Sequence, residues 1–333
     1  MRSGKRLVIY CGYWSAGPQE VARAAFELLR KVPNLRQLRL HNLPITCFNP
    51  ADSTTMQTTL LLPHLSNLTI STYGSPNPFP YVCSDLLKTS GHRIGRFKVD
   101  GYRRNNIVPS EEHQLNFGGN LRSLKVICSS YQVMLQPAQM DLNSLKGLQE
   151  LHRYGCADDA PDLTTEFFEI IAPTLEKLTI FGKYPASGAR CLNLLTHMSQ
   201  LHLYVLPSES ALFYHLPSSL AFLRLNYDTG LLPVLTRWNV EPSLVPTMLK
   251  HILIDDIDDG DTLRLLPSLN KLGTSCIGRT TELLAHLRPG AAPFKVLEVY
   301  FSRDNEERIP AIEAECKRLG VKFCRRIAPW GRD

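Results

Sequence analysis

The stretch LRQLRL, residues Leu35 to Leu40, decides the fold, because its pattern of leucines returns along the whole chain. Ten further windows of the form L-x-x-L-x-L follow it, with other apolar residues in place of some leucines. The eleven starts lie 20 to 30 residues apart, as expected of a chain built from repeated structural units. The further windows are LSNLTI at Leu65, IGRFKV at Ile94, LRSLKV at Leu121, LQELHR at Leu148, LEKLTI at Leu175, MSQLHL at Met198, LAFLRL at Leu220, LKHILI at Leu249, LNKLGT at Leu269 and FKVLEV at Phe294.

Apolar and polar residues alternate within these windows. Of the 22 residues at the second and fifth positions, only Ala221 and Leu253 are apolar, although 44% of the chain is hydrophobic. This alternation predicts strands with one buried and one solvent-facing side, whose fourth and sixth residues point inward. The sixth position is polar at Arg153 and Thr274, so we expect those two units to be distorted.

Prolines and short helical patterns separate the windows. A proline lies two or three residues before the first position of six windows, and runs such as LTTEFFEIIA precede several of them. Because proline ends a helix and favours extended backbone before it, each unit reads as strand, loop, helix and proline. A crossover helix between two strands makes those strands parallel. We therefore predict an α/β leucine-rich repeat solenoid (horseshoe) of about eleven irregular repeats, with a parallel β-sheet on the concave face and short helices on the convex face.

The repeats predict a single leucine-rich repeat domain over 1–333. Its first unit, 1–34, has no N-terminal cap, and the repeats occupy 35–304. The segment IPAIEAECKRLGVKF resembles the helix and terminal strand that often finish leucine-rich repeat proteins, which implies that 305–333 form a C-terminal cap.

The opening stretch LVIYCGYWSAGPQE, residues 7 to 20, invites three interpretations: a nucleophile turn, a phosphate loop or one more repeat. A nucleophile turn needs G-x-S-x-G, but Tyr13 stands where the first glycine belongs. The chain also lacks G-x-x-x-x-G-K-[ST]. Leu7 and Ile9 are in phase with Leu38 and Leu40, which favours a first strand followed by a strand-to-helix loop.

Composition points to a reducing compartment and gives no sign of a membrane helix. The 333 residues carry a net charge of +6, which is low for a dedicated nucleic-acid binder. Nine cysteines, an odd number without a CxxC pair, are typical of reduced thiols. We expect a cytoplasmic or nuclear protein.

Motifs for catalysis or metal binding are weak. The run Asp255 to Asp261 approaches an EF-hand loop, but Gly260 takes the third ligand position. The histidines form no HExxH and no Cys/His set with zinc spacing. We expect no catalytic residues, no cofactor and no metal, and hence no enzyme.

The concave face is the most informative predicted surface. The third, fifth and seventh positions of each window project from it, and they carry more basic than acidic residues, with aromatic residues at the seventh position of three consecutive units. Arginine and aromatic side chains are typical of interaction hot spots. The alternative is that the aromatic rings only cover the edge of the core. The predicted protein-binding residues are Arg39, Arg96, Lys98, Lys125, Tyr154, Lys177, Phe181, Tyr204 and Arg224.

The segments LPHLSNLTI, IAPTLEKLTI and LPSLNKL, with their irregular spacing and Cys156 at a ninth position, resemble the leucine-rich repeat region of F-box proteins, especially the divergent sets of fungi. The resemblance implies a substrate-recognition region of a ubiquitin ligase receptor that binds another protein. The basic residues of the concave face favour an acidic segment of that protein as the ligand.

The chain departs from that family because it contains no F-box, the segment that docks a ligase adaptor. A ligase adaptor is therefore expected as a partner only if an F-box lies upstream in a longer protein, and the missing N-terminal cap favours such a truncation. The alternatives are a stand-alone scaffold or inhibitor resembling ribonuclease-inhibitor-type proteins, and nucleic-acid binding through the basic concave stripe. No membrane partner is expected.

Overall fold

A computed structural model of the chain describes the residues from 5 to 327 with gaps between the repeats. Two compact units divide the chain, Met1–Leu175 and Glu176–Asp333, called unit 1 and unit 2 below. The residues described are 5–10, 24–25, 27–41, 62–72, 91–101, 116–127, 140–154, 164–181, 190–204, 213–227, 231–257, 263, 265–275, 277–301 and 303–327.

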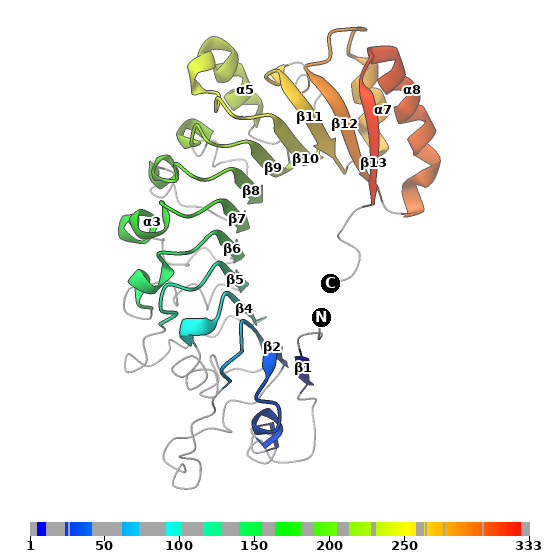
Figure 1. The fold of residues 1–333 in the computed structure, drawn as a ribbon. Coiled ribbons are helices and arrows are strands. Elements are labelled where there is room, and N and C mark those ends of the chain that lie inside the picture. Colours follow the sequence, from blue (N-terminus) through cyan, green and yellow to red (C-terminus); the bar gives the residue numbers. More distant parts are fainter. Residues whose placement is uncertain are drawn as a thin grey trace. The chain divides into compact units, whose positions relative to one another are not determined.

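Unit 1 contains six strands that pair side by side in sequence order, all parallel (Figure 1). The strands are β1 (Lys5–Tyr10), β2 (Leu35–His41), β3 (Asn67–Thr72), β4 (Arg96–Gly101), β5 (Ser123–Ile127) and β6 (Glu150–Tyr154). Short helical turns and α-helical segments accompany them, among them η3 (Gly91–Arg93), η5 (Leu142–Leu145) and α3 (Thr165–Ile171). Residues 24–25 and 27–30 are also α-helical.

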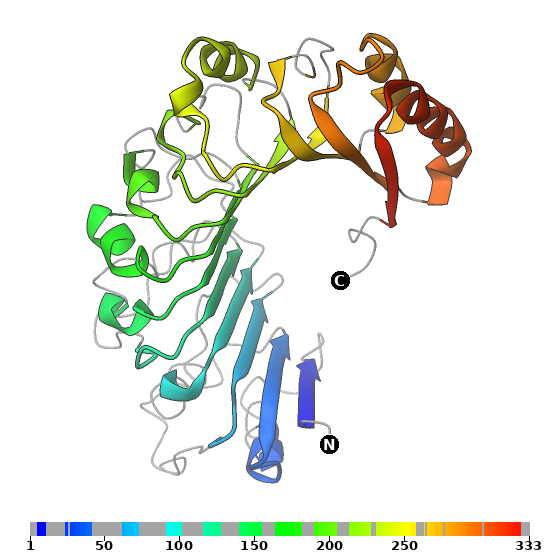
Figure 2. The ribbon, with the colours of Figure 1, turned by 45° about the horizontal axis from the view of Figure 1, so that its top comes forward.

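Unit 2 has the same architecture, with seven parallel strands that pair in sequence order. They are β7 (Lys177–Phe181), β8 (Gln200–Tyr204), β9 (Phe222–Tyr227), β10 (His251–Asp256), β11 (Leu269–Thr274), β12 (Phe294–Phe301) and β13 (Lys322–Ile327). Its helices include η6 (Arg190–Leu194), α5 (Leu231–Val240), η8 (Pro242–Leu244), α7 (Ile277–Ala285), η9 (Arg303–Arg308) and α8 (Ile309–Leu319). Figure 2 shows α7 and α8 on the same side of strands β12 and β13.

Burial follows the predicted alternation. All residues at the fourth and sixth window positions are at most 3% exposed, and Leu38, Leu124, Leu178 and Leu223 are among them. The apolar surface of such a side chain is removed from water only when the neighbouring strands carry apolar residues at the same window position. The in-register pairing of the strands ensures this. The predicted leucine-rich repeat solenoid is confirmed.

A repeated backbone contact joins consecutive repeats near the start of their strands. The carbonyl oxygen at the second window position accepts hydrogen bonds from the N–H groups at the second and third positions of the next repeat. The carbonyl oxygens of Ser66, Gly95, Arg122, Glu176, Ser199, Ala221 and Lys250 all do so, at donor–acceptor distances of 2.8 to 3.2 Å. The backbone N–H and C=O groups at the second and third window positions are therefore hydrogen-bonded between repeats.

The prolines were predicted to mark the step from helix to strand, and two of them begin tight turns there. The N–H of Leu220 donates to the carbonyl oxygen of Pro217, and that of Leu249 to Pro246, at 3.1 and 3.0 Å. Each turn brings the chain from the helical side to the first buried position of the next strand.

The two units expected to be distorted are regular. Arg153 pairs in register with Val126, and Thr274 pairs in register with both Ile254 and Val299. Both side chains are buried at their inward positions, at 3% and 1% exposed. The expectation was wrong because the neighbouring strands set the register, and one polar inward residue does not shift it.

Both predicted ends of the repeat array form strands. Leu7 and Ile9 of β1 pair with Leu38 and Leu40, so LVIY is in phase with the later repeats; the loop at 11–17 lies outside the described residues. At the other end, α8 and β13 confirm the predicted helix and strand. Gly320 ends α8 in the left-handed conformation (φ 71°), which glycine adopts without steric cost.

No helix among the described residues is long and apolar enough to cross a membrane.

Leu178→Ala should lower the free energy of unfolding by about 2–5 kcal/mol, because Leu178 is fully buried and its removal leaves a cavity. The matched control is Lys177→Ala, on the adjacent and partly exposed position, with an expected change of within about 0.5 kcal/mol. Chemical denaturation of both variants measures the difference; equal effects would contradict the inward assignment of the fourth position.

Candidate interaction surface on the open face of the sheet

The third, fifth and seventh residues of each window lie on the face of the sheet opposite to the buried leucines, called the open face below. In-register pairing places residues of the same window position side by side on neighbouring strands, which are about 4.8 Å apart. Thr69, Lys98 and Lys125 form one such row on β3, β4 and β5. The open face of each unit is therefore a set of rows running across the strands.

In unit 1 the predicted basic residues come together. Arg39 and Arg96 are exposed, and Lys98 and Lys125 are half-buried. Lys98 and Lys125 are direct neighbours, and Thr69 stands between Lys98 and Arg39 in the same row. These four residues are called the basic stripe: Arg39, Arg96, Lys98 and Lys125.

The electrostatics of the basic stripe are uneven. The Nζ atom of Lys98 lies 3.2 Å from a carboxylate oxygen of Asp100 on the same strand. Burial lowers the pKa of His41, and the positive charges of Arg39 and Lys98 lower it further, while Asp100 opposes them. The ring of His41 stacks on that of Tyr10 at a centroid distance of 4.5 Å. Positive potential therefore dominates next to His41.

The predicted binding residues of unit 2 differ in how exposed their side chains are. Lys177 is half-buried, and Phe181 is 39% exposed at the end of β7. The backbone of Phe181 pairs with Tyr204 of β8. The side chains of Tyr204 and Tyr154 lie outside the described residues, so the aromatic ladder stays a prediction.

Arg224 departs from the expected exposed contact. Its side chain is buried, at 6% exposed, and its Nε and Nη2 atoms donate to both carboxylate oxygens of Asp255 on β10, at 2.7 to 3.1 Å. Ser275 Oγ donates to the Asp255 carbonyl oxygen at 2.9 Å. The sequence pattern did not indicate this ion pair, because Arg224 and Asp255 are 31 residues apart in the chain.

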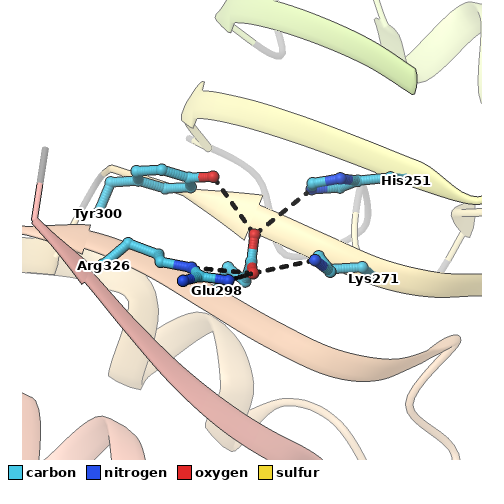
Figure 3. A network of polar contacts seen from close by, with 5 residues as sticks. All are labelled: His251, Lys271, Glu298, Tyr300 and Arg326. Carbon is cyan, nitrogen blue, oxygen red and sulfur yellow. Dashed lines mark hydrogen bonds and ion pairs between the residues drawn. The ribbon is translucent and has the colours of Figure 1, made fainter. Parts of the chain in front are cut away.

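A second group of polar residues was not predicted as a site: the Glu298 cluster, consisting of His251, Lys271, Glu298, Tyr300 and Arg326 on strands β10 to β13 (Figure 3). Lys271 Nζ donates to Glu298 Oε1 at 3.0 Å, and Arg326 donates to the same oxygen through Nε and Nη2 at 3.2 and 3.1 Å. The Tyr300 hydroxyl donates to Oε2 at 3.3 Å, and His251 Nε2 lies 4.0 Å from Oε2.

One buried apolar residue, Leu253, lies beside this cluster on the same face. Glu298 is 3% exposed although it occupies an open-face position, and its row neighbour Leu253, two strands away, is 4% exposed. Gly273 lies between them, and a Cβ atom there would lie 2.7 Å from Leu253 Cδ1. Gly273 thus lets Leu253 lie across the strand.

The titration of the cluster follows from burial and the two cations. Burial alone would raise the pKa of the Glu298 carboxyl, but hydrogen bonds from Lys271 and Arg326 outweigh it and lower that pKa. Burial and the charge of Lys271 lower the pKa of His251 to about 4. Burial, and then the Glu298 charge, raise the pKa of Tyr300. At neutral pH the cluster therefore holds a carboxylate between two cations, with a neutral imidazole and a neutral phenol beside it.

The described residues contain no group of three or more His, Cys, Asp or Glu side chains that could hold a metal ion; of the acidic run, 258–261 lie outside them. The cluster itself is rich in donors. The arrangement suits recognition of negative charge.

The fold and these two surfaces define a leucine-rich repeat protein with a charged open face. No protein-family model matches the chain, and no curated protein does. Solved structures similar to it include the leucine-rich repeat-containing protein LegL7 from Legionella pneumophila, at 12% identity and a TM-score of 0.46, covering 95% of this chain and 98% of that one. Another is the Rad7 and Elc1 complex in yeast, at 15% identity and a TM-score of 0.43, covering 97% of this chain and 81% of that one. The repeat fold of this chain is established by its own strand register and burial.

Gly273→Ala should lower the free energy of unfolding by about 1–3 kcal/mol, because the added methyl group collides with buried Leu253. Adding Leu253→Ala removes the collision, so the double variant should be more stable than the sum of the single effects predicts. A double-mutant cycle by urea denaturation measures this coupling, and strict additivity would contradict it.

Protonation of His251 should make the protein less stable in mild acid. Its pKa is about 4 when folded and 6.5 ordinarily, so the unfolded chain binds the proton first as the pH falls. The stability that depends on neutral His251 is complete above pH 6.5, declines between 6.5 and about 4, and then changes no further.

The measurement is the free energy of unfolding against pH for the wild type and His251→Gln, whose decline over this range should be shallower. His197→Gln, at an exposed turn, is the control. Parallel curves for the wild type and His251→Gln would refute the assignment.

Proposed function

We propose that the chain is a non-catalytic protein-interaction module that binds an acidic segment of a partner protein through the basic stripe of unit 1. The observation that carries this proposal is the exposure of Arg39 and Arg96 beside Lys98 and Lys125 on adjacent strands. A rigid sheet holds the backbone of these cations at fixed spacing. Binding a partner therefore costs little conformational entropy in this chain.

The charge balance of the same face supports an acidic partner. Among the described third, fifth and seventh positions of unit 1, including the exposed Arg6 of β1, five residues are basic, whereas Asp100 and Glu150 are acidic. Complementary charge speeds association and favours acidic over basic partners. The sheet presents side chains rather than free backbone, so recognition depends on these residues.

The resemblance of the repeats to those of F-box proteins extends the proposal to a substrate-recognition region of a ubiquitin ligase receptor. In that role the repeats would only hold a partner in position, and the chemistry would take place on other subunits. A ligase adaptor among the bound proteins would support the receptor role, and its absence from a full-length protein would favour the stand-alone scaffold or inhibitor.

Nucleic-acid binding is the second candidate, and the same basic stripe favours it. Phosphate contacts make such binding steeply dependent on salt. The acidic residues on the face argue for the protein ligand, since they would repel a continuous phosphate backbone.

Arg96→Glu with Lys98→Glu should abolish most partner capture in affinity purification with mass spectrometry from the source cell, because the reversal opposes an acidic ligand. The matched control is Arg30→Glu with Lys31→Glu, which reverses two exposed charges of unit 1 that precede β2. If both variants retain the same partners as the wild type, the basic stripe is the wrong surface. Loss of nucleic acid rather than protein from the purified complex would favour the second candidate.

A further inference from the structure

The Glu298 cluster holds more positive than negative charge. Lys271 and Arg326 each carry one positive charge, and Glu298 supplies one negative charge. His251 adds none at neutral pH, since its pKa is about 4. Tyr300 keeps its proton, because burial and Glu298 raise its pKa. One positive charge therefore has no counter-charge within the cluster.

The two cations converge on one atom. Lys271 Nζ and Arg326 Nη2 lie 3.0 and 3.1 Å from Glu298 Oε1. Nitrogens this close to a common oxygen are near enough for the two oxygens of one further carboxylate to contact both. Figure 3 shows both side chains directed to Glu298 from strands on either side of it.

The exposed fractions of the three side chains distinguish the residue that holds the cluster, Glu298, from the two that a ligand could contact, Lys271 and Arg326. The Glu298 side chain is 4% exposed, whereas those of Lys271 and Arg326 are 34% and 58% exposed. Lys271 has two further N–H groups, and Arg326 Nη1 has no hydrogen-bond partner among the residues described. The buried carboxylate thus holds two partly exposed cations, whose remaining N–H groups are not used by Glu298.

The Arg224–Asp255 pair on the same face provides an internal comparison. It has one cation for one carboxylate, and its side chains are 7% and 14% exposed. The guanidinium donates to both oxygens of Asp255. Its charge is balanced and its side chains are largely buried, so it is a structural pair. The Glu298 cluster has one unbalanced positive charge, and its two cations are partly exposed.

We propose that Lys271 and Arg326, anchored by Glu298, form an anion-recognition site that binds an aspartate or glutamate side chain of a partner protein. The choice of a protein carboxylate rests on the proposed interaction role, whereas the anion site does not. A carboxylate carries the single negative charge and the two oxygen acceptors that the cluster lacks. A phosphate group, with a charge of roughly −1.5 to −2, would exceed the unbalanced charge.

The test uses the full chain and a hexaglutamate peptide, with hexaglutamine as the neutral comparison, in low-salt buffer. Lys271→Gln with Arg326→Gln should weaken hexaglutamate binding about tenfold. The matched control, Lys250→Gln with Lys295→Gln, removes two exposed charges at second window positions of unit 2. It should change the affinity less than about twofold. Equal losses in both variants would overturn the site in favour of general charge attraction.

A local reporter identifies where the peptide binds. The His251 ring lies 4.0 Å from Glu298, so its NMR signal, assigned with His251→Gln, should move to saturation with hexaglutamate and not with hexaglutamine. An unmoved His251 signal at saturating peptide would overturn the site even if the basic stripe binds the peptide. Saturation of this signal by inorganic phosphate but not by hexaglutamate would overturn the carboxylate assignment.

A third variant guards against misfolding, since the double variant leaves Glu298 buried without its cations. Lys271→Gln with Glu298→Gln and Arg326→Gln removes the buried carboxylate as well, and Lys250→Gln alone matches its net loss of one charge. This variant should also lose hexaglutamate binding about tenfold, and binding equal to that of Lys250→Gln would overturn the proposal. The capture experiment on Arg96 and Lys98 probes other residues, so each proposal can fail independently.

Discussion

The apolar side chains at the fourth and sixth positions of each repeat leave water only by packing against the same positions of the strands on either side. Leu178 on β7 and Leu201 on β8 pair in register, and both are completely buried. No single repeat could bury these groups alone, because a strand with a short helix encloses too little volume. The strand register, the turns at the prolines and the shared carbonyl oxygens all serve this stacking.

Because the buried face is fixed by the alternation of side chains, the open face is left to vary between repeats. Unit 1 uses it for basic residues that remain partly or fully exposed. Unit 2 places buried Leu253 and Glu298 on the same face and surrounds the carboxylate with longer polar side chains. The same backbone therefore carries an exposed charged surface in one unit and an anchored charge cluster in the other.

The period of two residues predicted all eleven window strands and the inward leucines, and the helical patterns between the windows predicted their parallel order, because these features depend on local pattern and on repetition. The basic stripe in unit 1 followed from the same rule. The burial of Arg224 and Glu298 could not be predicted, since it depends on partners about one repeat away, Asp255 and Arg326, and on the missing side chain of Gly273. Arg153 shows the converse: a polar residue at an inward position suggested irregularity, yet neighbouring strands kept the register.

The contacts that join repeats span short and similar stretches of chain. Ser66 donates to the carbonyl oxygen of Arg36, 30 residues earlier, Arg122 to that of Gly147, 25 residues later, and Ser219 to that of Met198, 21 residues earlier. Low sequence separation of this kind favours rapid folding that starts at one place and spreads to adjoining segments. Local unfolding of one repeat should likewise extend only to adjoining segments. Hydrogen exchange should therefore show graded protection along the repeats instead of a single cooperative opening.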